Sequence, residues 1–259
     1  MAGLRDKVVL ITGASGGIGA AVAVQLAKQG CRLALNGRNV DKLEDTATKC
    51  RETGLRSDMI FLVPGDISQE EIASEILEKT IEKFNQLDIL VNNAGVVLID
   101  TIENMDMANF DRVMNINFRA AVYLTHLAVP YLVATKGNVV NVSSASAAVP
   151  GSMRLTYGVS KAALEHFTKS AALHLGPKQV RVNCISPGYV DTDILPNAGV
   201  DPETIKAFTG QLKDAHPIGR YGQPDDISDM IVAVASDSAR FMTGAVVAVD
   251  GGMQLSAAF

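Results

Sequence analysis

Seven short apolar segments recur along this chain of 259 residues, and segments of helical period separate them. Most of the apolar segments are hydrophobic throughout, which is typical of strands covered on both faces. Between them, segments such as 68–84 carry one apolar stripe against a charged face. This alternation predicts an α/β fold, a doubly wound parallel sheet of seven strands with helices on both faces. The predicted strands are 7–13, 32–37, 59–66, 88–95, 137–144, 180–188 and 245–252.

The pattern contains no linker and no internal repeat, so we predict that residues 1–259 form a single domain. Residues 189–226 form the one long irregular stretch. In a compact domain, a loop of this length is usually functional or disordered. We expect a lid at about 190–222.

Composition argues against several classes of function. The net charge is −5, so nothing favours nucleic acid or an anionic membrane as a partner. The longest apolar region, 120–134, is shorter than the roughly 20 residues that span a bilayer, and the first residues do not resemble a signal peptide. The three cysteines indicate no disulfide framework, and the four histidines lack metal-ligand spacing. We expect a cytoplasmic protein without a metal site.

A glycine-rich turn, TGASGGIG at 12–19, follows the first predicted strand and leads into a helix. Gly13 permits a tight turn, Gly17 lets a diphosphate approach the backbone, and Gly19 allows the helix to pack on the strand. The free N–H groups and the helix dipole favour an anion at this position. The turn therefore predicts a dinucleotide site.

Tyr157 and Lys161 lie four positions apart on a predicted helix, which places both side chains on one face. A free phenol has a pKa near 10, too high for efficient proton exchange at neutral pH. A neighbouring ammonium stabilises the phenolate, and lowering the phenol pKa by about 3 units requires roughly 4 kcal/mol. We therefore expect Tyr157 to be an acid whose pKa Lys161 lowers.

The order and spacing of the motifs resemble those of the short-chain dehydrogenase/reductase family over nearly the whole chain. The motifs are TGASGGIG (12–19), GD (65–66), NNAG (92–95), NIN (115–117), VSS (142–144), YGVSK (157–161), SPGYVDTD (186–193) and TGAVVAVDGG (243–252). The resemblance implies a Rossmann-type fold that transfers hydride between a nicotinamide cofactor and a ketone or secondary alcohol. Within the family, the chain looks most like 3-oxoacyl reductases and broad carbonyl or hydroxysteroid reductases.

The resemblance also indicates which cofactor to expect. Similar NAD-dependent enzymes carry Asp at the position of Gly37, and here Arg38 follows it. A guanidinium binds phosphate in bidentate fashion, so we expect NADP(H). Against this, Ser15 and Gly16 stand where many NADP-dependent relatives place a second basic residue, and Arg38 could simply be a solvated charge.

The remaining cofactor contacts follow from the matching motifs. Asp66 would accept from the adenine amino group, with Ile67 against the ring, although an Asp before Ser68 could equally cap a helix. The segment from Pro187 to Thr192 would close over the nicotinamide carboxamide. The full set expected is Gly13, Ser15, Gly17, Ile18, Gly19, Arg38, Asp66, Ile67, Asn93, Ala94, Gly95, Tyr157, Lys161, Pro187, Gly188, Val190 and Thr192.

The resemblance assigns four catalytic residues. A carbonyl that receives hydride develops negative charge on oxygen, which needs a donor and a proton. Ser144 would supply the donor and Tyr157 the proton. Asn117, preferred over Asn115, would anchor a water leading to Lys161.

Substrate and partners are expected to follow the same pattern. Lys136 and Lys178 lie on loops where carrier-protein reductases dock an acidic carrier. Helices near 118–134 and 160–175 are apolar on more than one side, which predicts a homo-oligomer, a tetramer or dimer. Beyond 190, four apolar residues form either a lid over a lipophilic substrate or the packed side of a surface helix. They are Ile194, Leu195, Phe208 and Leu212.

Two alternative functions stay open. One is an NAD(H)-preferring hydroxysteroid or other secondary-alcohol dehydrogenase. The other, of a different class, is a non-catalytic NADP-binding regulatory protein. Its expected sign is loss of Ser144, Tyr157 or Lys161, and all three are present.

Overall fold

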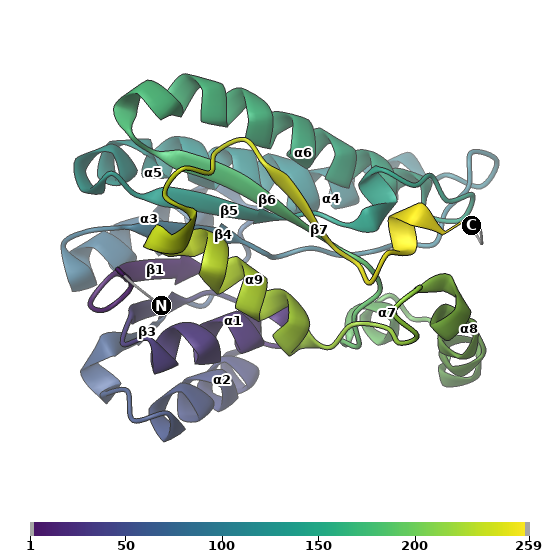
Figure 1. The fold of residues 1–259 in the computed structure, drawn as a ribbon, viewed down its shortest axis with the longest axis horizontal. Helices are drawn as coiled ribbons and strands as arrows, with labels where there is room; N and C mark the ends of the chain where they lie inside the picture. The colour runs from purple at the N-terminus through teal and green to yellow at the C-terminus, as the bar shows by residue number, and fades with distance from the viewer. Residues whose placement is uncertain (1–2, 257–259) are drawn as a thin grey trace.

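The computed structural model describes residues 3–256 and contains one seven-stranded sheet with every pair of neighbouring strands parallel. The strand order is β3-β2-β1-β4-β5-β6-β7 (Figure 1). All seven predicted strands are confirmed, each with shorter ends than expected. They are β1 (Val8–Ile11), β2 (Arg32–Leu35), β3 (Ile60–Leu62), β4 (Ile89–Asn92), β5 (Asn138–Val142), β6 (Arg181–Pro187) and β7 (Val246–Val249).

Helices cover both faces of the sheet, as the alternating pattern predicts. The α-helices are α1 (Gly17–Lys28), α2 (Val40–Glu52), α3 (Glu70–Phe84), α4 (Met107–Met114), α5 (Ala120–Thr135), α6 (Leu155–Leu175), α7 (Ile194–Asn197), α8 (Pro202–Ala215) and α9 (Pro224–Ala235). Short helical turns are η1 (Ser57–Met59), η2 (Asn115–Arg119), η3 (Ala145–Ala147), η4 (Gly176–Lys178), η5 (Asp237–Ala239) and η6 (Met253–Leu255).

Two buried clusters form the core, one on each face. Val9 and Ile11 of β1 pack with apolar residues of α1, α2 and α9. Val8 and Leu10, which point to the other face, pack with residues of α3, α5 and α6 (Figure 1). Successive residues of β1 thus serve opposite layers, so the strand must be apolar at every position. The edge strand β7 is an exception, because its residues are only partly buried or exposed.

The strand order indicates where a ligand would bind on this sheet. β1 pairs with β2 on one side and with β4 on the other, so the chain changes direction across the sheet between β3 and β4. In doubly wound sheets, ligands bind at the carboxyl ends of the strands at such a switch point. Here the glycine turn after β1 and residues 93–95 after β4 meet at this point.

The expectation of an irregular stretch over 189–226 is wrong. This region contains α7 and α8 and the first residues of α9, and α7 and α8 project beyond one end of the sheet (Figure 1). Asp201 caps α8 by accepting from the Thr204 N–H at 2.9 Å, and Pro202 begins the helix. These are ordinary helix-start signals.

A π-helical turn interrupts the long helical segment that crosses the sheet. α4 continues through η2, a π-helix, into α5. A π-turn often marks a functional position, because it releases the regular backbone hydrogen-bond pattern. This turn carries Asn117. Among residues 3–256, no helix is long and apolar enough to cross a bilayer.

Candidate active site

The glycine turn is packed so tightly that larger residues do not fit. Gly13 and Gly17 have φ angles of 69° and 53°, in the left-handed region that favours glycine. A Cβ at Gly13 would stand 2.9 Å from the Cα of Ala94, and a Cβ at Gly19 would overlap the carbonyl oxygen of Gly13. The turn therefore brings its backbone into direct contact with the segment after β4.

Residues after β4 hold this turn in place. The Thr12 hydroxyl accepts from the backbone N–H groups of Asn93 at 3.0 Å and Ala94 at 3.1 Å. The Asn93 side chain donates to the carbonyl of Thr12 at 2.9 Å and to that of Gly13 at 3.3 Å. In the structure, the Asn93 side chain is therefore used to shape the turn.

The turn and the start of α1 fit an anionic group. The N-cap of α1 is Gly16, which has no side chain, and the first turn of α1 carries no acidic residue. The first turns of α2, α3 and α9 each carry an acidic residue. The Ser15 hydroxyl, beside this helix start, is buried and has no partner among residues 3–256. Free N–H groups and an orphaned hydroxyl are what a dinucleotide phosphate would satisfy.

Gly37, at the end of β2, bears on cofactor choice. A Cβ at position 37 would overlap the Ser15 hydroxyl. The Asp that similar NAD-dependent enzymes carry here would therefore require the Ser15 side chain to move. Arg38, the next residue, is exposed.

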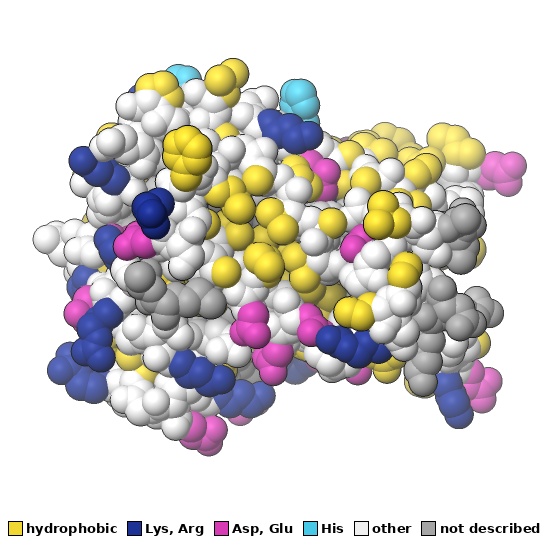
Figure 2. Space-filling view, viewed as in Figure 1, with side chains coloured by type: hydrophobic (Ala, Val, Ile, Leu, Met, Phe, Trp, Pro, Cys, Tyr) yellow, Lys and Arg dark blue, Asp and Glu magenta, His cyan; other side chains and the backbone are white. Residues whose placement is uncertain are grey.

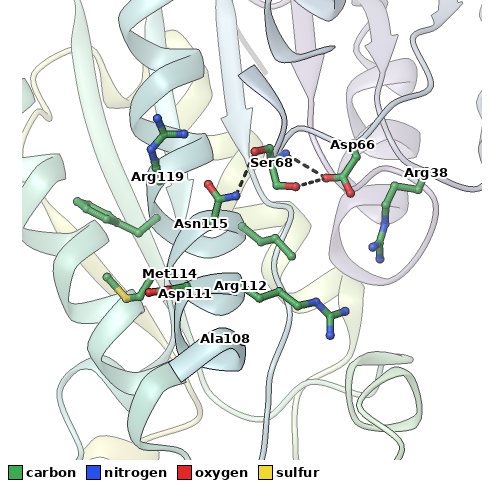
Figure 3. Close-up of a pocket in the computed structure, with 11 residues that line it drawn as sticks. Arg38, Asp66, Ser68, Ala108, Asp111, Arg112, Met114, Asn115 and Arg119 are labelled. Atoms are coloured by element: carbon green, nitrogen blue, oxygen red, sulfur yellow. Dashed lines mark hydrogen bonds between the residues drawn. The ribbon is translucent and has the colours of Figure 1, made fainter. Parts of the chain in front are cut away.

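A hollow of about 760 Å³ lies between Arg38 and Asp66 on one side and α4 with η2 on the other (Figure 3). Asp66 accepts from the backbone N–H of Ser68 at 3.0 Å and from its hydroxyl at 2.7 Å, which forms a local turn. It does not cap α3, whose N-cap residue is Gln69 and which has no side-chain cap bond. Ile67 is buried beside Asp66. Asn115 donates to the Ser68 carbonyl at 3.1 Å, which ties the two walls together.

The sequence analysis did not name Arg112 as a site residue. It also did not predict that Asn115 lines the hollow and bonds the Ser68 carbonyl. Both line this hollow, and Arg112 brings a second guanidinium to the space that Arg38 lines (Figure 3). Arg112 and Asn115 lie three positions apart, a spacing that places both on one face of a helix. That spacing was the available signal.

Ser144 and Tyr157 come together at the carboxyl end of β5. Ser144 is the second residue after the strand and accepts from the Ser146 backbone N–H at 3.2 Å. Burial raises the pKa of Tyr157, while its hydrogen bond with Ser144 and the positive charge of Arg154 act in the opposite direction. The pair therefore forms a hydrogen-bonded unit in a desolvated position.

Lys161 lies one helical turn beyond Tyr157 and is 3% exposed. Its Nζ donates to the carbonyl of Val142 at 2.8 Å and lies 5.8 Å from the centroid of the Tyr157 ring. Burial lowers the pKa of Lys161 to about 8. The ammonium is thus placed next to the phenol, as the spacing predicts.

The sequence predicted that Lys161 lowers the pKa of Tyr157, and the structure shows the opposite direction. The pKa of Tyr157 is raised, because the loss of solvent around the buried phenol outweighs the nearby groups that favour phenolate. Lys161 is itself desolvated and engaged with Val142, which limits its effect on Tyr157.

Asn117 is 1% exposed and lies in the π-turn η2. Its side chain accepts from the Val96 N–H and donates to the Val96 carbonyl, both at 2.8 Å, and donates to the Ser160 hydroxyl at 3.1 Å. A Cβ at Gly95 would lie 3.3 Å from both the Asn117 Oδ1 and the Lys161 Nζ, so the two side chains flank Gly95. The Asn117 side-chain amide is occupied by these bonds to Val96 and Ser160. A water leading to Lys161 would therefore have to bind a main-chain group of Asn117.

The segment after β6 reaches across to the glycine turn. Gly188 has no room for a side chain, since a Cβ there would lie 3.0 Å from the Cα of Asp250. A Cβ at Gly17 would lie 3.0 Å from the Thr192 methyl, so this segment lies against the start of α1. Lys42 of α2 pairs with Asp193 at 3.0 Å and adds a second link.

The apolar residues of 190–222 were expected either to form a lid over substrate or to pack as the inner side of a surface helix. Leu212 is 2% exposed, and the Phe208 ring packs edge-on against Tyr189 with centroids 5.5 Å apart. Tyr189 in turn packs against Tyr221 at 5.6 Å. The packing interpretation therefore holds for Phe208 and Leu212. Ile194 and Leu195 are only partly buried.

No group of three or more His, Cys, Asp or Glu side chains suited to a metal ion occurs within residues 3–256. The site thus consists of a dinucleotide-type turn, a hollow lined by arginines, and a Ser144–Tyr157–Lys161 group at the carboxyl edge of the sheet.

Comparison with known proteins agrees with this geometry. A family model described as enoyl-(acyl carrier protein) reductase matches residues 13–254. A 3-oxoacyl-[acyl-carrier-protein] reductase of Thermotoga maritima is 31% identical and covers 96% of this chain and 98% of its own. A trans-4-hydroxycyclohexanecarboxylate dehydrogenase of Sinomonas cyclohexanicum is 34% identical and covers 96% and 93%.

A solved structure shows the same fold with a cofactor. It is a short-chain dehydrogenase/reductase of unknown function from Caenorhabditis elegans, 31% identical, with a TM-score of 0.92 over 98% of this chain and 97% of the other. From the family model, the relatives and the shared fold, it follows that this chain belongs to the short-chain dehydrogenase/reductase family, whose oxidoreductases bind a nicotinamide cofactor.

Proposed function

We propose that the protein is an NADP(H)-dependent oxidoreductase that transfers hydride between nicotinamide and a ketone or secondary alcohol. The observation that carries the proposal is the meeting of Ser144, Tyr157 and Lys161 beside the glycine turn. Ser144 comes from the segment just after β5, and Tyr157 and Lys161 come from α6. The carboxyl edge of the sheet, where they lie, is where such folds bind ligands.

The residues divide the chemical work. The bound cofactor supplies or accepts the hydride. The Ser144 hydroxyl donates a hydrogen bond to the substrate oxygen, where negative charge develops during reduction. The Tyr157 hydroxyl then gives its proton to that oxygen. Lys161, buried next to the phenol, stabilises the phenolate that remains and bonds a cofactor ribose hydroxyl.

Several contacts support NADP(H) over NAD(H). Arg38 and Arg112 bring two guanidinium groups to the adenosine side, and phosphate is the group such forks bind best. Ser15 offers a hydroxyl without a partner among residues 3–256, and the Asp that would repel a 2′-phosphate is absent at position 37, where its Cβ would overlap the Ser15 hydroxyl. Stronger thermal stabilisation by NADH than by NADPH would overturn this cofactor choice.

A lipophilic or 3-oxoacyl substrate is the best match to the site. The relatives named above act on a 3-oxoacyl carrier and on a cyclohexane alcohol. The segment 190–222 serves as the lid, with the partly buried Ile194 and Leu195 facing substrate and α8 packed behind them. Lys136 and Lys178 remain the candidates for docking an acidic carrier.

The test is cofactor oxidation with a panel of lipophilic ketones and 3-oxoacyl thioesters, comparing wild type with Tyr157→Phe. We expect turnover by wild type and a loss in kcat of roughly 10²–10⁴-fold in the variant. Equal turnover by both proteins would remove Tyr157 from the mechanism. If NADPH binds but no compound of either class turns over, the non-catalytic NADP-binding alternative is favoured.

We also propose that the protein is a homo-oligomer in the cytoplasm. Hydrophobic side chains gather over β7 and α9 in Figure 2, and the edge strand β7 has an unpaired side. An exposed edge of this kind is normally covered, and a second copy would cover it. Light scattering that finds a stable monomer would refute this proposal. All three cysteines are free thiols, which fits a reducing compartment.

A further inference from the structure

Arg154 lies three residues before Tyr157, at the start of α6, and is its N-cap residue. Its backbone has φ −146° and ψ 43°, outside the helical region, so its side chain leaves the chain just before the first turn of α6. The guanidinium folds back over Gly151, with its Nη2 3.5 Å and its Nε 3.7 Å from where a Cβ at Gly151 would stand. Its positive charge reaches the phenol, since it lowers the pKa of Tyr157 against the larger effect of burial. Arg154 therefore stands at the start of the helix that carries the reacting group.

The Arg154 guanidinium has no acidic partner. It is half-buried, and within residues 3–256 it forms no ion pair or side-chain hydrogen bond. Arg residues that are partly desolvated usually pair with a carboxylate or a carbonyl. The first turn of α6 also has no acidic residue. The charge is thus available to a ligand.

The one carboxylate held beside Arg154 is committed elsewhere. Asp100 forms an isolated backbone bridge with Arg154, and its N–H donates to the Met153 carbonyl at 3.2 Å. Its carboxylate accepts from the backbone N–H of Thr156 at 3.3 Å and from the Thr156 hydroxyl. Asp100 therefore fixes the backbone around Arg154 and leaves the guanidinium unneutralised.

We propose that Arg154 binds a carboxylate carried by the substrate, so that the preferred substrates are oxo acids and the corresponding hydroxy acids. This inference rests on the proposed oxidoreductase function and names its substrate class. A guanidinium binds a carboxylate through two parallel hydrogen bonds, which would orient the ketone towards Ser144 and Tyr157. The carboxylate is unchanged in the reaction. Hydride and proton are added only to the ketone carbon and oxygen.

The test uses matched pairs of substrates. Linear oxo acids from 3-oxobutanoate to 6-oxoheptanoate are compared with their methyl esters, which keep the ketone and remove the charge. The variants are Arg154→Met and Arg154→Lys. The control is Arg56→Met, because Arg56 is exposed on η1 and pairs only with the exposed Asp58.

We expect wild type to favour the best acid over its ester in kcat/KM. Arg154→Met should lower kcat/KM on that acid by about 10- to 100-fold, the range for a lost hydrogen bond to a charged group, and affect the ester much less. Arg154→Lys should recover part of the loss, because lysine restores the positive charge but cannot form the two parallel hydrogen bonds of a guanidinium. Arg56→Met should behave as wild type on both substrates.

Other outcomes separate the two proposals. If esters are reduced as well as acids, or if Arg154→Met lowers both equally, Arg154 acts only through Tyr157 and the inference is wrong while the oxidoreductase function stands. If wild type reduces neither acids, esters nor other ketones, the proposed function fails and the inference with it. If Arg154→Met does not fold, as judged by its melting curve, the acid-to-ester ratio of Arg154→Lys decides.

Discussion

Asp100, in the loop after β4, caps the helix that carries the tyrosine. Its carboxylate accepts from the backbone N–H and hydroxyl of Thr156, the residue directly before Tyr157. The helix has no side-chain cap of its own at Arg154. A residue distant in sequence thus satisfies the donors at the start of α6 and links the loop after β4 to the catalytic helix.

Asp100→Ala should therefore affect both stability and rate. We expect a loss of about 1 kcal/mol in the free energy of unfolding, the usual cost of a lost cap. We also expect kcat to fall by up to about 100-fold, because the position of Tyr157 shifts at the reacting centre. Urea denaturation and steady-state kinetics measure the two effects.

Asp106→Ala is the matched control. Asp106 caps α4 through the N–H groups of Ala108 and Asn109 at 2.8 and 3.1 Å, in the same loop, and among the described residues its side chain forms no hydrogen bond with α6. It should cost similar stability and leave kcat near the wild-type value. An equal fall in kcat for both variants would show that the rate follows general loop stability.

Lys161→Met should change the pH dependence of stability. Burial lowers the pKa of Lys161 from 10.5 to about 8. Below pH 8 the folded and unfolded chains both carry the ammonium, so the cost of burying it is fully present. Between pH 8 and 10.5 the unfolded chain binds more protons, so wild-type stability rises with pH relative to the variant, by about 3 kcal/mol in total.

The measurement is urea denaturation of both proteins at pH 7, 8.5 and 10. The variant's relative stability should be highest at pH 7 and fall by pH 10, while its kcat is low throughout. Lys49→Met, which removes an exposed lysine of α2, should show no such trend. A pH-independent difference for Lys161→Met would mean that the folded protein holds this amine with an ordinary pKa.

Gly37→Asp should fail to create an NAD enzyme unless Ser15 changes as well. A Cβ at position 37 overlaps the Ser15 hydroxyl, so the single variant should lose about 1–3 kcal/mol of stability through overpacking. Ser15→Gly/Gly37→Asp removes the overlap. We expect the double variant to recover its melting temperature and to bind NADH better than NADPH. A stable single variant that prefers NADH would contradict this.

The three cysteines should be unreactive in the folded protein. Cys31, Cys50 and Cys184 are buried, and burial raises the pKa of each thiol to about 12. The thiolate is the reactive species, so its population at pH 8 is very small. A chromogenic disulfide reagent should label all three in guanidinium chloride and none without it. Rapid labelling of one thiol under native conditions would place it at an exposed site.

The sequence alone predicted the layer structure, and it proposed most of the candidate site residues but not Arg112. Apolar runs such as β1 must be strands covered on both faces, and seven of them alternating with helices leave little choice of fold. The spacing of Tyr157 and Lys161 sets their common face because a helix has a fixed period. The bounds of helix α8 were not predicted, although Asp201 and Pro202 at its start are local signals that the sequence carries.

Tertiary structure decided what each polar group is free to do. Asn117 and Asn93 are held by partners from distant segments, Asp100 is engaged with Thr156, and Arg154 is left unpaired. The direction of the Tyr157 pKa shift also depends on burial, which no spacing reveals. Helical period and apolar patterning are local properties of a chain, whereas hydrogen-bond partners and desolvation arise only when segments far apart in sequence pack together.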